Sequence, residues 1–349
     1  NQITINSEAL KHNYHFLSQL QPQTQIAPVL KSNAYGHGLN LVAPVFDNLK
    51  PPFLIVDSLY EAYELYKLKI KTPILIIGYT DPRNYQVKPL PFHYTVFDLE
   101  TARALNRHQP GSKVHLFVDT GMNREGVRLE NLNQFLTEIK KLKNLKVEGL
   151  ASHLADADNE NSSVFTQKQL AKYKQALKIC HQQQLELRWR HLAASAGAFK
   201  TKAKTFNLIR AGLASYGLHP FAQQKSSPLQ PALSFTSTVS QIKTLHQGEK
   251  VSYNCTYQAP QKMTIGILPA GYQEGVDRRL SNRGVVKIKN KFCPIIGRVC
   301  MNLTIVDLST VKDPQVGLKA EIYAAQAQAK NSIQNQATKA KTIPYQLLT

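Results

Sequence analysis

The sequence APVLKSNAYGHG occupies residues 27–38, where an apolar, strand-like run ends on Lys31. A turn of small residues containing two glycines follows at once. Because desolvation disfavours the ammonium ion, a lysine at the dry end of a strand can lose its proton and form a Schiff base with a carbonyl cofactor. From the local pattern alone, a strand-end lysine that reaches solvent is the commoner interpretation.

Outward from this segment, the first two-thirds of the chain alternates apolar strand-like runs with helical segments, which is typical of βα units around a parallel sheet. Ser7 is the expected cap of a first helix. The candidate strands are Ile26–Leu30, Phe53–Asp57, Ile74–Ile77, His93–Phe97, Val114–Asp119, Val147–His153, Leu187–Ala193 and Leu208–Ala211. This is the number in a closed (β/α)8 barrel, so we predict an α/β fold with an N-terminal TIM-like barrel.

In a barrel of this kind, the residues at the carboxyl ends of the strands share one mouth, where the chemistry of such proteins takes place. Five polar residues fall at these ends, namely Lys31, Asp119, His153, His191 and Arg210. We therefore expect them to lie around a common site.

The sequence changes near Ser226, after which prolines and short β-branched runs replace the helical pattern. We predict a barrel domain over residues 1–225 and a mostly β domain over residues 226–349. The strands expected in the second domain are Leu233–Val239, Met263–Leu268, Gly284–Ile288 and Leu303–Val306. Helical periodicity is expected over Glu321–Lys330, and the glutamine- and alanine-rich patch Ala324–Ala337 is expected to be a solvated helix.

The composition is that of a globular, soluble protein, with 349 residues of which 42% are hydrophobic. No apolar run approaches the ~20 residues that cross a bilayer. The cysteines Cys180, Cys255, Cys293 and Cys300 match neither a metal-binding motif nor a disulfide framework, so we expect free thiols in the cytoplasm and no metal. The chain begins with Asn1 rather than Met, which is compatible with the removal of a leader.

The formal net charge of +20 raises the alternative of a nucleic-acid-binding protein. However, the lysines are scattered through amphipathic segments such as Thr166–Lys178, and no zinc-finger, RNP-like or helix-turn-helix signature accompanies them. We expect a basic, well-solvated surface that attracts anionic small molecules, and no nucleic-acid or membrane partner.

Three further motifs have both a chemical and a structural interpretation. In VDTGMNREGV (118–127), Arg124 is either an arginine fork for a carboxylate or part of a simple βα loop. In KVSYNCTY (250–257), Tyr253 is either a base or a packed strand tyrosine. His153 and Arg210 end strands, where a lone histidine is more often structural and an arginine often forms a surface ion pair.

These motifs, together with GRVCM at 297–301, stand in the order found in the alanine racemases, which the chain resembles from Thr4 to Tyr345. The resemblance implies a fold-type III pyridoxal 5'-phosphate (PLP) enzyme that interconverts L-alanine and D-alanine and supplies D-alanine for cell-wall peptidoglycan. The alternative of the same fold is a broad-spectrum amino-acid racemase.

The resemblance also implies a role for individual residues. Lys31 and Tyr253 would be the two bases, with Lys31 serving the D side and Tyr253 the L side of the substrate. The two residues of one site would come from different subunits of a homodimer, because in the family the β domain of one subunit covers the barrel mouth of the other. The implied cofactor-binding residues are Lys31, Tyr35, His153, Ser195, Arg210, Gly212, Leu213 and Tyr216, and the implied substrate-binding residues are Arg124 and Met301.

Arg210 has a specific implied role, because it donates to the pyridine nitrogen where many PLP enzymes place a carboxylate. Such an arginine weakens the cofactor as an electron sink and favours proton exchange over transamination or decarboxylation. A fold-type III decarboxylase is disfavoured on this ground, and a PLP-carrier protein because such proteins lack the β domain.

The chain departs from the family pattern at several positions. Phe117 replaces the lysine whose carbamate positions the arginine, so a bound anion such as chloride is one alternative for orienting Arg124. Ala194 replaces an asparagine and Asn302 an aspartate. A family tyrosine that touches the cofactor phosphate would lie past Thr349.

Overall fold

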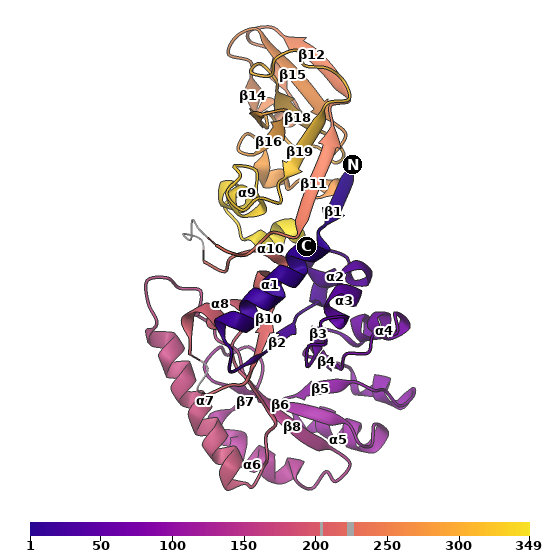
Figure 1. Ribbon diagram of the computed structural model, residues 1–349, viewed down its shortest axis with the longest axis vertical. Helices are drawn as coiled ribbons and strands as arrows, with labels where there is room; N and C mark the ends of the chain where they lie inside the picture. The colour runs from indigo at the N-terminus through magenta and orange to yellow at the C-terminus, as the bar shows by residue number, and fades with distance from the viewer. Residues whose placement is uncertain (203–204, 222–226) are drawn as a thin grey trace. The chain divides into compact units, whose positions relative to one another are not determined.

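The structure is a computed structural model that describes residues 1–202, 205–221 and 227–349 (Figure 1). Its contacts divide the chain into two compact units. The barrel unit comprises residues 10–215, with the described residues 219–221, and the C-terminal unit comprises residues 1–9, 216–218 and the described residues from 227 onward. The domain boundary expected between residues 225 and 226 lies outside the described residues. No helix in the described part of the chain has the length and apolarity to cross a membrane.

The barrel unit confirms the prediction of a parallel barrel with eight strands in its wall. These strands are β2 (Gln25–Pro28), β3 (Leu54–Val56), β4 (Ile74–Ile76), β5 (His93–Val96), β6 (Lys113–Asp119), β8 (Lys146–Ala151), β9 (Trp189–His191) and β10 (Leu208–Ala211). β3, β4, β5, β6, β8 and β9 pair in that order, and β10 pairs with β2. Parallel bridges from Val29 to Ile55 and from Ala194 to Arg210 join the two sheets into a closed ring. The short β7 (Val127–Arg128) pairs with β6 outside the ring.

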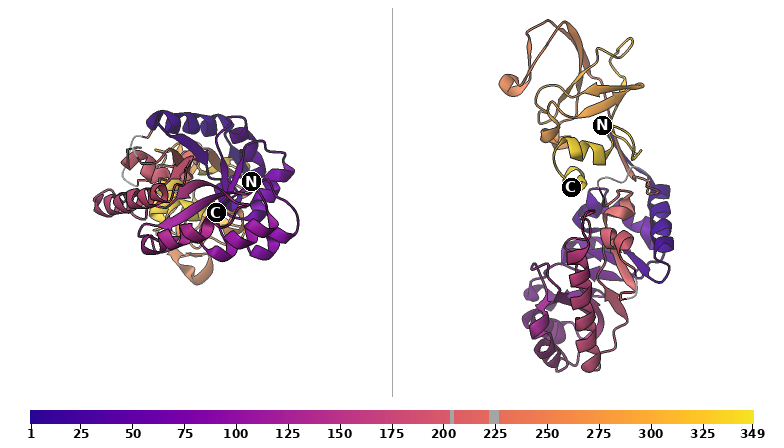
Figure 2. Two further views of the ribbon diagram at one scale, coloured as in Figure 1. Left: turned by 90° about the horizontal axis from the view of Figure 1, so that it is seen from below. Right: turned by 90° about the vertical axis from the view of Figure 1, so that its left-hand side faces the viewer.

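Helices of the barrel unit lie around its strands (Figure 2). They are α1 (Ser7–Leu20), α2 (Lys31–Tyr35), α3 (Leu39–Asp47), α4 (Leu59–Lys67), α5 (Leu99–His108), α6 (Leu129–Ile139), α7 (Val164–Gln182) and α8 (Ser195–Lys200), with the 3-10 turns η1 (Pro82–Gln86) and η2 (Leu213–Tyr216). The first three residues of α1 and the last residue of η2 group with the C-terminal unit. Capping side chains set several helix starts. Ser58 and Glu61 form a capping box at α4, and Asp98 Oδ1 accepts from the Thr101 amide at α5.

The expected cap of the first helix was wrong by one residue. Ser7 is the first residue of α1, and the side chain of Asn6 accepts from the amides of Glu8 and Ala9 at 3.0 and 3.1 Å. Asparagine and serine are comparable caps, so composition alone did not distinguish the two neighbours.

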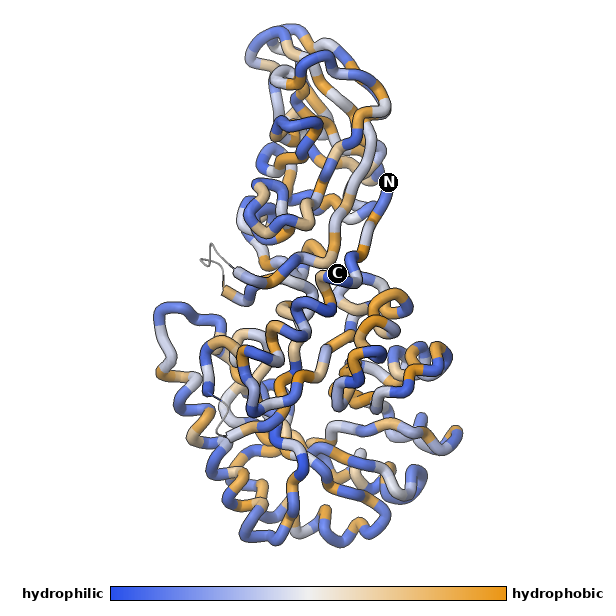
Figure 3. Tube along the Cα trace, in the orientation of Figure 1, coloured by the Kyte–Doolittle hydropathy of each residue, from blue (hydrophilic) through white to orange (hydrophobic). Residues whose placement is uncertain are grey.

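The C-terminal unit is built from antiparallel sheets, as expected of a β-rich domain. A five-stranded sheet has the order β1 (Gln2–Ile5), β11 (Leu233–Thr238), β19 (Lys319–Tyr323), β16 (Val285–Ile288) and β17 (Lys291–Pro294). A three-stranded sheet has the order β12 (Gln241–Leu245), β15 (Met263–Leu268) and β18 (Thr304–Asp307), and β13 (Lys250–Val251) pairs with β14 (Tyr257–Gln258). Figure 3 shows hydrophobic and hydrophilic residues interspersed along the chain of this unit, and in β11 buried residues alternate with less buried ones, as one-sided burial requires. The chain's first strand joins this unit through β11.

The helix expected over Glu321–Lys330 was wrong. The segment begins in strand β19, where Ala320 and Ile322 are buried on one face, and continues in turns. The helix α9 (Ile333–Lys339) begins only after Ser332, whose side chain accepts from the Asn335 amide. It is followed by α10 (Pro344–Leu348), and the remaining 3-10 turns are η3 (Tyr253–Cys255), η4 (Tyr272–Glu274) and η5 (Arg278–Leu280).

Candidate active site

Lys31 lies three residues after the end of β2, directly before an unusual left-handed turn. Residues 32–35 all have φ between 53° and 55°, and the turn ends at Gly36 with φ 75°. For residues with a Cβ this conformation costs roughly 1–2 kcal/mol each. Neighbouring side chains hold the turn, because Asn33 Oδ1 accepts from the Leu39 amide at 2.7 Å and Glu61 accepts from the Asn33 amide at 3.4 Å. Strain held in this way beside a lysine is typical of functional sites.

The nearest charged partner of Lys31 is Asp57, which the sequence analysis did not single out. Lys31 Nζ lies 3.2 Å from Asp57 Oδ1, and the two side chains are 37% and 52% exposed. Asp57 directly follows the buried strand β3, so a carboxylate at a strand's carboxyl end was the available signal. An exposed pair of this kind is worth at most about 1 kcal/mol, so Lys31 can leave it at little cost.

Arg210 is buried at the barrel mouth and donates hydrogen bonds to several residues there. Its Nη1 donates to His191 Nδ1 and to the His191 carbonyl, both at 2.9 Å. Its Nη2 donates to the Ser152 carbonyl at 2.6 Å and to His153 Nδ1 at 3.0 Å. These bonds use the four N–H groups of the two terminal nitrogens, and among the described residues no acceptor lies on the Nε–H. One guanidinium donor is therefore left for a ligand.

The positive charges around His153 show that several predicted site residues are close together. Burial, and after it the charges of Arg210, Arg124 and Lys31, lower the pKa of His153 to about 3. Burial also lowers the pKa of Arg210 to about 10, so the guanidinium remains charged at neutral pH. The mouth thus combines a neutral imidazole with three cations, an environment that suits an anionic ligand.

A small cradle lies beside β10. The hydroxyl of Tyr35 is only 2.4 Å from where a Cβ on Gly212 would stand, so only glycine fits there with the ring in place. Ser195 is buried, and its Oγ accepts from the Ala214 amide at 3.2 Å. A hydroxyl, a serine and a glycine-led turn gathered in this way can surround a phosphate. Leu213 follows Gly212 in this turn, at the start of η2.

Gly212→Ala tests this cradle. The added methyl should displace the Tyr35 ring, lowering stability by about 1–3 kcal/mol and the affinity for PLP by about tenfold. Thermal unfolding and a cofactor titration measure the two effects. Adding Tyr35→Phe removes the nearest clashing atom and leaves the ring carbon at 3.0 Å, so it should recover stability but not affinity. Wild-type cofactor affinity in Gly212→Ala would contradict the cradle.

Arg124 lies on the loop after β6 and is 52% exposed, with its Nε 3.1 Å from the carboxylate of Glu125. Asp119 shapes this loop, because its Oδ1 accepts from the amides of Gly121 and Asn123. Phe117 packs close to Gly126, where an added Cβ would lie 2.9 Å from its ring. In this structure Glu125 therefore pairs with the arginine, and Phe117 contributes only packing.

Tyr253 and Met301 lie in the C-terminal unit, on loops that contact each other. Ser252 donates to the Arg298 carbonyl at 2.7 Å, and its Oγ lies 3.4 Å from Cys300 Sγ. Tyr253 is 66% exposed and Met301 is 55% exposed. These loops therefore each present an exposed side chain, an aromatic hydroxyl on one and a thioether on the other, on the surface of their own unit.

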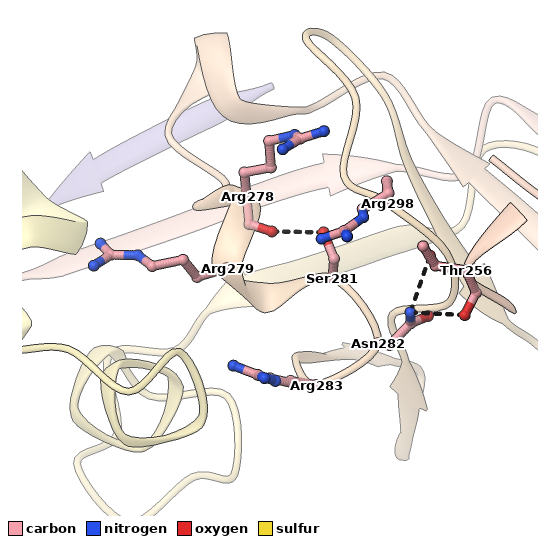
Figure 4. A pocket seen from close by; sticks show the side chains of 7 residues that line it. All are labelled: Thr256, Arg278, Arg279, Ser281, Asn282, Arg283 and Arg298. Atoms are coloured by element: carbon pink, nitrogen blue, oxygen red, sulfur yellow. Dashed lines mark hydrogen bonds between the residues drawn. The ribbon is translucent and has the colours of Figure 1, made fainter. Parts of the chain in front are cut away.

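A pocket of about 370 Å³ lies beside these loops (Figure 4). It is lined by Thr256, Arg278, Arg279, Ser281, Asn282, Arg283 and Arg298. Asn282 donates to Thr256 and accepts from the Gly297 amide, which fixes the wall of the pocket. Of the four guanidinium groups, Arg279 is paired with Asp277 at 2.5 Å. The pocket therefore gives this surface a strongly positive potential.

Comparison with known proteins identifies the arrangement. The family model for the alanine racemase N-terminal domain matches residues 5–220, and that for the C-terminal domain matches residues 232–349. The chain belongs to the alanine racemase family. It is 34% identical to the alanine racemase of Carboxydothermus hydrogenoformans, over 99% of this chain and 95% of that protein.

Solved alanine racemases have the same fold. The Bacillus anthracis structure with bound L-Ala-P is 30% identical with a TM-score of 0.89, covering 99% of this chain and 91% of that one. The Bartonella henselae structure with covalently bound pyridoxal phosphate is 25% identical with a TM-score of 0.87, covering 99% and 95%. The resemblance of the motifs to the alanine racemases is thus confirmed.

The family's motifs are distributed over the two units. Lys31, Arg124, His153 and Arg210 lie close enough for their charges to act on one another, and Tyr35, Ser195 and Gly212 lie in the same unit. Tyr216 groups with the C-terminal unit, where its carbonyl accepts from the Ala232 amide, and Tyr253 and Met301 belong to that unit too.

Proposed function

We propose that the barrel mouth holds PLP through Lys31 and that this site interconverts L-alanine and D-alanine. As a member of the alanine racemase family, the chain is a PLP-dependent isomerase. The observation that carries the proposal is Arg210, whose four terminal N–H groups are bound inside the barrel while its Nε–H is left for a ligand. A donor fits an unprotonated pyridine nitrogen, and the cradle of Tyr35, Ser195 and Gly212 fits a phosphate.

When bound, PLP supplies the conjugated ring that takes up the electron pair left at Cα of the amino acid. The residues of the chain do the rest. Lys31 Nζ takes or returns the Cα proton on the D side, and Tyr253 Oη does so on the L side. Arg124 leaves Glu125 to bind the substrate carboxylate, and Met301 lies beside that carboxylate.

His153 is suited to support the tyrosine. Because Arg210 can only donate, the Nδ1 of His153 is an acceptor and the proton of the neutral ring is on Nε2. An Nε2–H group can donate to the oxygen of the deprotonated tyrosine and stabilise it. Leu213 and Tyr216 complete the proposed set of residues around the phosphate.

We further propose that the active unit is a homodimer in which the partner subunit's Tyr253 and Met301 complete each site. The exposure of both side chains on one loop cluster supports this assembly. Four free cysteines support a cytoplasmic location, where D-alanine is made for peptidoglycan.

A broader amino-acid racemase remains the second candidate, favoured by two features near the carboxylate. Phe117 stands where a lysine is frequent, and Asn302 donates to Glu274 at 2.7 Å instead of supplying a negative charge of its own. Initial rates with alanine, serine, lysine and arginine decide between the two candidates. Alanine at least about tenfold faster than the others would favour the specific racemase.

The proposed function is tested with the purified protein. It should show the yellow, borohydride-sensitive absorbance of covalently bound PLP and convert either alanine enantiomer to an equal mixture in a chiral assay. Removal of the cofactor should abolish conversion, and its return should restore it. A colourless protein that racemises alanine, or a yellow one that racemises no amino acid, would contradict the proposal.

A further inference from the structure

Three buried histidines form a cluster inside the barrel that the proposed chemistry does not use. They are His93 on β5, His115 on β6 and His191 on β9. The rings of His93 and His115 have centroids 5.7 Å apart, and those of His115 and His191 are 4.9 Å apart. Phe53 packs edge-on against His93 and His115, so the cluster is closely packed. Its last member, His191, contacts Arg210.

Arg210, His191 and His115 form a hydrogen-bonded series, and its donors and acceptors can be assigned starting from Arg210. Arg210 can only donate, so His191 Nδ1, 2.9 Å away, accepts and the proton of His191 is on Nε2. His191 Nε2 lies 2.8 Å from His115 Nδ1, which therefore accepts. The proton of His115 is then on Nε2, which is buried with no partner among the described residues. The unsatisfied donor thus lies at the end of the series remote from Arg210.

The barrel is shaped to hold His115 in this position. Gly149 on β8 is directly opposite His115 in the sheet register. A Cβ at Gly149 would lie 2.5 Å from His115 Nδ1, so any larger residue would displace the ring from His191. The absence of a side chain at Gly149 therefore allows the His115 ring to lie within hydrogen-bonding distance of the His191 ring.

The histidines of this hydrogen-bonded series are neutral, and Arg210 at its end is the only charged member. Burial lowers the pKa values of His115 and His191 well below the usual value, and burial lowers that of His93 to about 4. Glu148 lies 3.9 Å from His93 and 3.4 Å from Lys113. Within the described residues, no carboxylate is paired with Arg210. Neutral rings therefore orient the guanidinium without cancelling its charge.

We propose that His115 is a positioning residue that holds His191 in its Nε2-protonated tautomer and thereby fixes the Arg210 guanidinium, with its Nε–H directed to the ligand. Without an acceptor at His115, His191 has a buried, unsatisfied N–H group or turns its proton toward a second donor on Arg210. Either result loosens the arginine. The catalytic consequence rests on the proposed function, whereas the tautomers do not.

The first test uses the wild-type holoprotein labelled with ¹⁵N-histidine. Two-bond ¹H–¹⁵N correlation spectra distinguish protonated from unprotonated ring nitrogens, and His115→Asn and His191→Asn spectra assign the signals among the 11 histidines. We expect protonated Nε2 and unprotonated Nδ1 in both rings. A proton on Nδ1 of either residue, or on both nitrogens, overturns the proposal. This result is independent of racemase activity, so it separates failure of the proposal from failure of the proposed function.

The second test compares two substitutions at one position. The side-chain amide introduced by His115→Asn keeps an acceptor near the place of Nδ1, whereas His115→Leu removes the acceptor. We expect His115→Leu to lower kcat about tenfold with KM changed less than about twofold, and His115→Asn to restore most of the loss.

His93→Phe is the control, because it alters the same cluster and leaves the hydrogen bonds from His115 to His191 and from His191 to Arg210 in place. It should retain wild-type kcat. Equal losses in the asparagine and leucine variants, or a loss in His93→Phe as large as that in His115→Leu, would show that packing alone is responsible and would overturn the proposal. If His115→Leu does not fold, Gly149→Ala tests the same contact by displacing the ring, and an unchanged His191 spectrum there would also overturn it.

Discussion

Lys31→Ala is expected to lose covalent cofactor attachment and to lower racemisation by at least about 10³-fold. The amine both anchors PLP and exchanges the proton on the D side, so one substitution removes two functions. The phosphate cradle and Arg210 do not depend on Lys31, so PLP should still bind reversibly. The absorbance spectrum before and after borohydride, followed by gel filtration, separates bound from covalently attached cofactor.

Two controls distinguish chemistry from folding in this experiment. Lys31→Arg keeps the positive charge beside Asp57 but supplies no Schiff-base amine, so it should be as inactive as Lys31→Ala. Thermal unfolding of the cofactor-free proteins should change by no more than about 1 kcal/mol, because the Lys31–Asp57 pair is exposed. Added methylamine should partly rescue Lys31→Ala only. A Lys31→Ala protein that retains covalent PLP would refute the assignment.

The barrel was predictable because its strands are short apolar runs that alternate with helical segments, and such runs can be recognised in the sequence without knowledge of their partners. The first and last predicted strands of the barrel, Ile26–Leu30 and Leu208–Ala211, correspond to β2 and β10, which pair with each other. The helix expected over Glu321–Lys330 failed for the converse reason. Its alanines and glutamines favour a helix locally, but Glu321 and Tyr323 at its start pair with distant strands of the five-stranded sheet.

Parts of the site depend on geometry that no short sequence pattern contains. The left-handed turn after Lys31 uses Ser32, Asn33, Ala34 and Tyr35, and none of these is a glycine that would signal a positive φ. The hydrogen-bonded series of histidines joins residues of β6 and β9, which are not adjacent in the sheet, across the barrel interior. The motifs identified Lys31, His153 and Arg210, whereas Asp57 and His115 emerged only from the packed structure.

Tyr253→Phe is expected to retain covalent PLP and to lower racemisation by at least about 10³-fold. The two proposed bases serve opposite sides of Cα, so the loss should be one-sided. In deuterated water, Lys31 should still exchange the Cα proton of D-alanine, while exchange from L-alanine should fall with racemisation. Equal losses of exchange from both enantiomers would contradict a two-base site.

Mixing the two inactive variants then tests whether sites are shared between subunits. In a heterodimer of Lys31→Ala and Tyr253→Phe, shared sites would place the intact lysine of one subunit and the intact tyrosine of the other at one site, and both defects at the second. Random reassociation of equal amounts should therefore recover about one quarter of wild-type activity. If both bases came from the same chain, every site would keep one defect and mixing would recover nothing. The tyrosine's exposure on its own unit leads us to expect recovery, measured after dissociation and refolding of the mixture, with each variant treated alone as the control.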